Sequence, residues 1–368
     1  MPNRRVWLLL LLAVVLRLLT QGWDSGLLTP HPDERQVAFV AEKAAGWFSD
    51  PGFFAYGSLH FRAVRAMAFA VGEARNYEGL LLGGRALSLL ASMVALALGW
   101  WMARRAWGTR TAQLFLLLIA FVPLDLQQSH YATVEAHHAA WVMAALAGCF
   151  WLATRSGWLP AAAAGAAVGA SLAVKVASLP LLLPLGLALW MGGGRREDPG
   201  RVELAGVAAA LAVVAFYIGQ PWAFVDALPP VAMVVAAASV AVLAGLARRF
   251  RGAGRVGLKV VATGLLLVIL ATAVSAVLWQ TDVAAPGSMT ARLGLSLNPA
   301  YRTGVGEQVA MVMGEADLAY VRVYQGTLPL LYPVRELGRW GIGPMLLLVV
   351  IVSVVLGCWW CLRRMGRW

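Results

Sequence analysis

Two adjacent carboxylates, Asp33 and Glu34, follow the first apolar segment of this 368-residue chain. They come directly after His31 and Pro32, and proline is favoured in the first turn of a helix. Ionisable groups are costly at the end of a membrane-crossing segment, so acids there indicate chemistry or ion handling. Alternatively, both acids cap an interfacial helix and face the positive end of its dipole. These residues alone leave both interpretations open.

A second group of ionisable side chains lies in the stretch PLDLQQSHYATVEAHH, residues 123–138. Glu135 and His138 are three positions apart and would share one face of a helix. Carboxylate and imidazole ligands suit zinc or manganese, so one interpretation is a divalent metal at Glu135 and His138. The other is that these groups hold a polar substrate while an ionised acid takes its proton.

Two lone cations, Arg85 and Lys175, lie in apolar segments. A lone cation in such a segment is expensive unless its flexible stem carries the charge to the interface. A phosphate group would also relieve that cost. Two cations and two acidic groups are predicted at one depth in the membrane. One anionic, lipid-borne substrate explains them better than four unrelated roles do.

The composition indicates an integral membrane protein, since 60% of residues are hydrophobic and 13% are charged. The net charge of +12 does not indicate a nucleic-acid partner, because the basic residues gather in short loops between apolar runs. Cys149, Cys358 and Cys361 cannot form a disulfide framework. We interpret the CWWC stretch as reduced, buried thiols rather than a redox or metal pair.

The sequence predicts an all-α, polytopic fold of about ten transmembrane helices, each needing about 20 apolar residues. The predicted spans are 6–22, 80–103, 111–126, 135–153, 158–175, 177–193, 203–219, 229–247, 257–279 and 341–362. The third and sixth are short and contain Pro123 or Pro180 and Pro184. The first is interpreted as an uncleaved span rather than a signal peptide. If successive spans cross the membrane in alternating directions, every loop on the same side as the N-terminus is basic. This predicts a multi-pass protein with cytoplasmic N- and C-termini.

Two outer segments are long. Residues 23–79 contain the stretches ERQVAFVAEKAAGWF and LHFRAVRAMAFAVGE, whose apolar spacing predicts amphipathic helices in the membrane interface, with Arg62 on a polar face. Residues 280–340 are interpreted as a lid or binding element, or as a passive ordered cap. We expect two modules, a catalytic one over 1–220 and a variable one over 221–368.

Several stretches occur together in a characteristic order. They are HPDERQVAFVAEKA, GRALSLL, PLDLQQSHYATVEA, VKVASLPLLLPL, GQPWAFVD and YQGTLPLLYPVRELGRWGIGP. In this order they resemble the multispanning glycosyltransferases of the C-type (GT-C) fold, in particular bacterial enzymes related to protein mannosyltransferases and to the lipid A aminoarabinose transferase (glycosyltransferase family 39-like). The resemblance runs from about residue 5 to residue 345.

The resemblance implies a transferase that moves a sugar from a polyprenyl-phosphate donor to an acceptor on the outer face of the membrane. Asp33 would act as the base or orient the acceptor, Glu34 would support it, and Glu135 would be the second acid. Arg85 and Lys175 would bind the donor phosphate. The expected substrate-binding residues are His60, His130, Tyr131, Tyr324 and Tyr332. A single displacement at the anomeric carbon predicts inversion there.

Three departures from the family pattern stand out. The sequence YGSLHFR replaces a proline-rich tyrosine motif and leaves the roles of His60 and Arg62 open, and Glu135 replaces an aspartate. The chain stops at Trp368, about where relatives continue, which fits a compact member, a truncated form or a subunit completed by partners.

Two other functions remain open. One is a non-catalytic subunit that binds a lipid-linked sugar within a membrane assembly. The other is a transporter, although the sequence has no convincing inverted repeat. The acceptor, whether protein, lipid or glycan, cannot be read from the sequence, and no cofactor other than the metal considered above is indicated. Alanine-rich spans and the excess of arginine over lysine fit a bacterial inner-membrane protein.

Overall fold

The computed structural model describes residues 4–19, 31–44, 49–73, 76–192, 200–224, 297–313, 315, 326–327 and 331–352. The elements described are helices, apart from one isolated antiparallel bridge between Phe224 and Leu297. They are α1 (Arg4–Leu19), α2 (Pro32–Lys43), α3 (Ser58–Ala70), α4 (Tyr77–Trp107), α5 (Thr109–Ala120), α6 (Pro123–Gln128), α7 (Val134–Thr154), α8 (Trp158–Val174), η1 (Val176–Leu181), α9 (Leu182–Gly192), α10 (Arg201–Gly219), η2 (Pro221–Ala223), α14 (Pro299–Met313), α15 (Leu331–Glu336) and η4 (Leu337–Gly341). A further helix covers 344–352.

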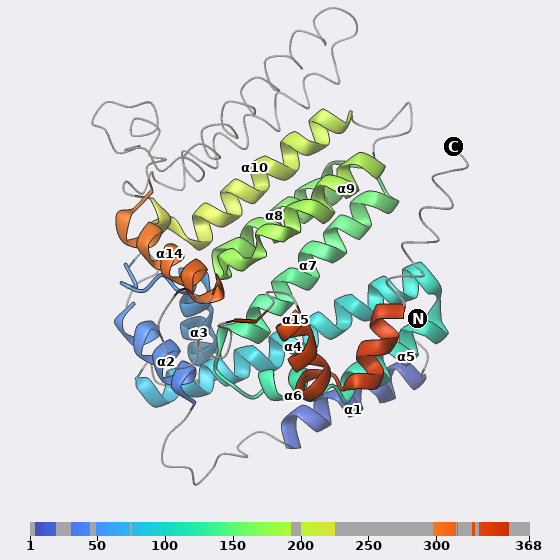
Figure 1. The fold of residues 1–368 in the computed structure, drawn as a ribbon, viewed down its shortest axis with the longest axis horizontal. Coiled ribbons are helices and arrows are strands. Elements are labelled where there is room, and N and C mark those ends of the chain that lie inside the picture. Colours follow the sequence, from blue (N-terminus) through green and yellow to red (C-terminus); the bar gives the residue numbers. More distant parts are fainter. Residues whose placement is uncertain are drawn as a thin grey trace, which may run out of the picture.

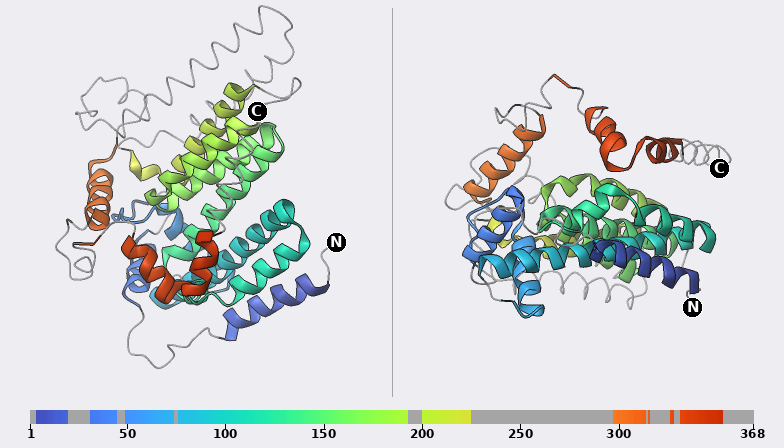
Figure 2. Two further views of the ribbon diagram at one scale, coloured as in Figure 1. Left: turned by 45° about the vertical axis from the view of Figure 1, so that its right-hand side comes forward. Right: turned by 90° about the horizontal axis from the view of Figure 1, so that it is seen from below.

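The long helices form a bundle that the short ones cover at one end. Helices α7, α8, α9 and α10 lie side by side, and α4 joins them to α5 and α1 (Figure 1). Helices α2 and α3 pack against the first half of α4, and α14 lies near them (Figures 1 and 2). The bundle therefore brings the starts of α4 and α7, the end of α8 and the predicted acids of α2 to the same end.

Helices α8 and α10 approach closely because glycine lies at their contact on two successive turns of α8. A Cβ added to Gly165 would lie 2.0 Å from the carbonyl oxygen of Ala208, and one added to Gly169 would lie 2.0 Å from that of Ala212. Small residues four positions apart let helix backbones approach, so that van der Waals packing can drive association in lipid. This contact fixes the end of α8, directly before Lys175.

The exposed surface of the long helices is apolar. Leu11 on α1, Leu114 on α5 and Leu183 on α9 are 58%, 54% and 76% exposed. An exposed surface this apolar is typical of a protein embedded in lipid. By length and composition, α4 and α7 can each cross a membrane, and α5, α8, α10 and the segment Val176–Gly192 are shorter apolar helices.

Most predicted spans within the described residues coincide with a helix, but two differ. The third ends at Ala120, before Pro123 opens the short helix α6. The sixth begins with the 3-10 helix η1, which contains Pro180. In both cases proline has no backbone N–H to donate to a regular helix. The predicted spans at 229–247 and 257–279 and most of the second module lie outside the described residues, so the number of spans stays a prediction.

The two amphipathic stretches of the first outer segment form α2 and α3, but Arg62 is not on a polar face. Its side chain is buried, and Nη1 donates to the carbonyl oxygens of Ile218 at 2.8 Å and Gly219 at 3.4 Å. The last carbonyls of a helix have no partner within the helix, and a cation there also meets the negative end of the dipole. Arg62 therefore ties α3 to the end of α10.

We expect Gly169→Ala to lower the free energy of unfolding by about 1–3 kcal/mol, because the added methyl group overpacks the contact with α10. The midpoint of thermal unfolding in detergent measures this change. The matched control is Gly186→Ala in α9, where an added Cβ meets nothing within 4 Å. Equal midpoints for the two variants would contradict the close contact between α8 and α10.

Candidate active site

Helix α2 begins at the acids that the sequence singles out. Pro32 lies in its first turn, and His31 Nδ1 accepts a hydrogen bond from the backbone N–H of Asp33 at 3.3 Å. The Glu34 carboxylate accepts one from the backbone N–H of His31 at 3.2 Å, which completes a capping box. The capping interpretation is therefore confirmed for Glu34.

Asp33 presents its carboxylate at the surface of this end. Its side chain is 56% exposed and lies 3.9 Å from His31 Nδ1. The same nitrogen accepts the hydrogen bond from the backbone N–H of Asp33. The Asp33 carboxylate is therefore open to solvent, and its predicted role as a base stays a prediction.

Glu34 is the fully buried counterpart of Asp33. Its two carboxylate oxygens accept hydrogen bonds from Arg85 Nε at 2.9 Å and Arg85 Nη2 at 3.1 Å, and Oε1 also accepts one from the Ala132 N–H at 2.7 Å. A bidentate arginine is the strongest common partner for a carboxylate. These bonds join α2, α4 and the segment before α7, and they pair the Arg85 guanidinium with a carboxylate. The prediction that Arg85 binds phosphate stays a prediction.

Glu135 and Lys175 form an ion pair at the same end. Lys175 Nζ donates to Glu135 Oε1 at 2.7 Å and lies 5.9 Å from the centre of the Tyr56 ring. The side chains of Glu135 and Lys175 are 44% and 25% exposed, so both remain accessible. Lys175 directly follows α8 in an extended backbone conformation, which lets its side chain reach the start of α7.

The segment between α6 and α7 connects the two acids. The ring centroids of His31 and Tyr131 are 4.9 Å apart, and the next residue, Ala132, donates to Glu34. Glu135 lies four residues after Tyr131, in the first turn of α7. Asp33 and Glu135 are therefore linked through one short segment and do not lie on opposite flanks of the bundle.

Both predicted substrate-binding histidines, His60 and His130, are buried. His130 Nε2 lies 3.2 Å from the carbonyl oxygen of Arg17, and burial lowers the pKa of His130. His60 Nδ1 lies 3.2 Å from Nδ1 of His137, whose Nε2 accepts a hydrogen bond from Trp141 at 3.0 Å. Burial lowers the pKa of His60 well below its usual value. Both environments favour the neutral ring.

The metal interpretation does not fit the described residues. Glu135 is held by Lys175, while His138 Nε2 lies 2.6 Å from Ser178 Oγ. No group of three histidine, cysteine or acidic side chains in the described part of the chain could hold a metal ion. Metal binding in proteins usually takes three or more side chains in one place.

The two predicted tyrosines of the second outer segment are differently placed. Tyr324 lies outside the described residues. Tyr332 lies in α15, where the Arg335 guanidinium is 4.9 Å from its ring centre. The neighbouring element η4 packs against α6, so this part of the chain lies over the segment that precedes α7 (Figure 2).

A second buried ion pair was, like that of Glu34 and Arg85, not predicted from the sequence. Arg17 is completely buried in α1 and pairs with Asp125 of α6, and its Nε donates to Ser92 Oγ at 2.9 Å. The sequence signal for this pair was an arginine within one predicted apolar span and an acid near the end of another predicted span. Their pairing could not be read from the sequence, because several other acids lie at the same predicted depth.

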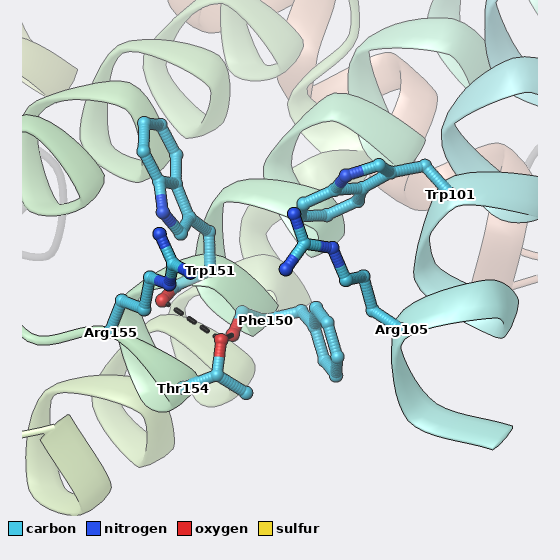
Figure 3. Close-up of a pocket in the computed structure, with 6 residues that line it drawn as sticks. All are labelled: Trp101, Arg105, Phe150, Trp151, Thr154 and Arg155. Carbon is cyan, nitrogen blue, oxygen red and sulfur yellow. Dashed lines mark hydrogen bonds between the residues drawn. The ribbon is translucent and has the colours of Figure 1, made fainter. Parts of the chain in front are cut away.

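A pocket formed by described residues lies at the other end of the bundle. It is lined by Trp101, Arg105, Phe150, Trp151, Thr154 and Arg155 (Figure 3). Because these residues belong to the ends of α4 and α7, this pocket is separate from Asp33 and Glu135. The predicted cavity around those acids stays a prediction.

Comparison with protein-family models and with curated proteins gives no match. Among solved structures, the chain is similar to ArnT from Cupriavidus metallidurans in the apo state, with a TM-score of 0.39 and 16% sequence identity. The alignment covers 93% of this chain and 73% of the ArnT chain. A similarity this low leaves the function to be argued from the residues of this chain.

We expect Glu34→Gln to lower the free energy of unfolding by about 3 kcal/mol, because it leaves the Arg85 cation without its carboxylate. Thermal unfolding in detergent measures the loss, and Glu34→Gln/Arg85→Gln should recover part of it. Asp33→Asn is the control, since its exposed carboxylate has no such partner. Equal losses for the Asp33 and Glu34 variants would contradict the assignment of Glu34 as the structural acid.

Proposed function

We propose that this chain is a membrane glycosyltransferase that moves a sugar from a polyprenyl-phosphate donor to an acceptor hydroxyl. The observation that carries the proposal is the exposed carboxylate of Asp33 at the same end of the bundle as the accessible pair of Glu135 and Lys175. Sugar transfer from a phosphate needs both a base for the incoming hydroxyl and a cation for the departing phosphate. The order of the family-like stretches in the sequence supports the same reaction.

In the proposed reaction the acceptor oxygen attacks the anomeric carbon from the side opposite the phosphate. The bond between that carbon and the phosphate oxygen breaks, and its electron pair leaves with the phosphate. Asp33 takes the proton of the acceptor hydroxyl. One displacement of this kind inverts the configuration at the anomeric carbon.

Lys175 is the cation that we assign to the departing phosphate. Only one of its N–H groups is used by Glu135, and the carboxylate holds the ammonium group in place at 2.7 Å. The stem of a lysine is flexible, so a fixed partner reduces the freedom lost when the phosphate binds. Glu135 also remains accessible enough to contact the acceptor or the donor sugar.

Glu34 and Arg85 have positioning roles in this proposal. Their ion pair fixes the start of α2, and Asp33 is the residue directly before Glu34. Tyr131, a predicted substrate-binding residue, lies beside this start through its contact with the His31 ring. His60 and His130 are buried, so we place them behind the substrate surface rather than on it.

The proposed location is a bacterial inner membrane with the acids on the outer face. Arg104 and Arg105 lie in the last turn of α4, and Arg155 directly follows α7, so the opposite end of the bundle is basic. Arginine and lysine concentrate on the cytoplasmic side of membrane proteins. The donor is a membrane lipid and the acceptor is reached from outside.

We expect Asp33→Asn to lower the rate of sugar transfer by about 100-fold or more, since it removes the base. The assay follows transfer from a panel of polyprenyl-phosphate sugars to membrane extracts, with donor binding measured in parallel. Glu42→Gln, at an exposed acid near the end of α2, is the control and should transfer as the wild type does. Unchanged transfer by Asp33→Asn would refute the proposed base. Donor binding by the wild type without transfer from any donor would favour a binding subunit instead.

A second variant tests the cation. Lys175→Met should lower kcat/KM for the donor by about 100-fold, as expected when one group that stabilises a developing negative charge is lost. Glu135→Gln keeps the ammonium group and removes only the carboxylate that positions it, so it should have the smaller effect. A larger loss for Glu135→Gln would show that the carboxylate, not the cation, is the essential member of the pair.

A further inference from the structure

The pocket between the ends of α4 and α7 lies far from the proposed reaction. Glu135 and Thr154 are at opposite ends of the 21-residue helix α7, which separates them by about 28 Å at 1.5 Å per residue. This pocket therefore needs an explanation of its own.

Two guanidinium groups from different helices meet at this pocket. Arg105 reaches toward it from the end of α4 and Arg155 from the residue after α7 (Figure 3). Neither Arg105 nor Arg155 takes part in an ion pair among the described residues. Two like charges facing one hollow repel each other, so an anion between them would be favoured electrostatically.

Aromatic side chains form the walls. The Trp101 and Phe150 rings meet edge to face with centroids 5.8 Å apart, which joins α4 to α7 beside the pocket. Arg105 lies 6.0 Å from the centre of the Trp101 ring, a contact that limits the positions of its guanidinium. Trp151 lines the other side (Figure 3). Tryptophan is enriched at the level of lipid headgroups, because its ring is largely apolar and its N–H group can contact water or a headgroup.

We infer that this pocket, at the basic end of the bundle, binds the headgroup phosphate of an anionic membrane phospholipid. Arginine matches phosphate with parallel N–H donors, and basic pockets between transmembrane helices on the cytoplasmic side suit anionic headgroups. The tryptophan rings would lie against the glycerol and upper acyl region of the lipid. A bound lipid would hold the ends of α4 and α7 together, so its effect would appear in stability rather than in the reaction at Asp33.

The test uses the purified full chain in detergent. Thermal unfolding is measured with added phosphatidylglycerol, with phosphatidylcholine and with inorganic phosphate, and lipid retention is counted by native mass spectrometry. The pocket variant is Arg105→Gln/Arg155→Gln. The control is Arg104→Gln/Arg110→Gln, which removes the same charge at the same end without touching the pocket lining.

We expect phosphatidylglycerol, but not phosphatidylcholine, to stabilise the wild type and the control, and the pocket variant to bind it about tenfold more weakly. If the control variant bound phosphatidylglycerol as weakly as the pocket variant does, the site would be overturned, and the binding would be explained by general charge attraction. Stabilisation by inorganic phosphate equal to that by phosphatidylglycerol would overturn the lipid as the ligand. The inference does not depend on sugar transfer, because none of these readouts requires activity.

Discussion

The buried carboxylate of Glu34 is the constraint on which the Asp33 end of the bundle depends. An unpaired charge at that position would be strongly destabilising, and the fork of Arg85 together with the N–H of Ala132 offsets this cost. The same bonds fix three segments that are far apart in sequence. Adjacent helical residues point about 100° apart, so burying Glu34 leaves Asp33 facing outward.

Other buried cations extend this pattern. Arg17 pairs with Asp125 and reaches Ser92, while Arg62 donates to the last carbonyls of α10. Each cation joins helices that are far apart in the sequence. The pair of Glu135 and Lys175 differs because both side chains remain partly exposed. Exposure thus separates the pair of Glu135 and Lys175 from the pairs that are buried between helices.

Much of the local structure could be predicted from the sequence. Pro32 and the acids after it predicted the start of α2, and apolar spacing predicted α2 and α3. The predictions were wrong where they relied on the local sequence pattern alone. Arg62 looked like a surface residue because the free carbonyls at the end of α10 cannot be seen in the sequence of α3. At Ala120, a continuous apolar run concealed the break before α6.

The sequence by itself determined which residues are ionisable, roughly where the helices lie and that their surfaces suit lipid. Only the tertiary structure decided the partner of each charge. Asp33 and Glu34 are adjacent and chemically alike, yet one is exposed and the other is buried against Arg85. The physical reason is that the free energy of a carboxylate depends on its solvation and its nearest cation, and for Glu34 both are supplied by residues far away in the chain.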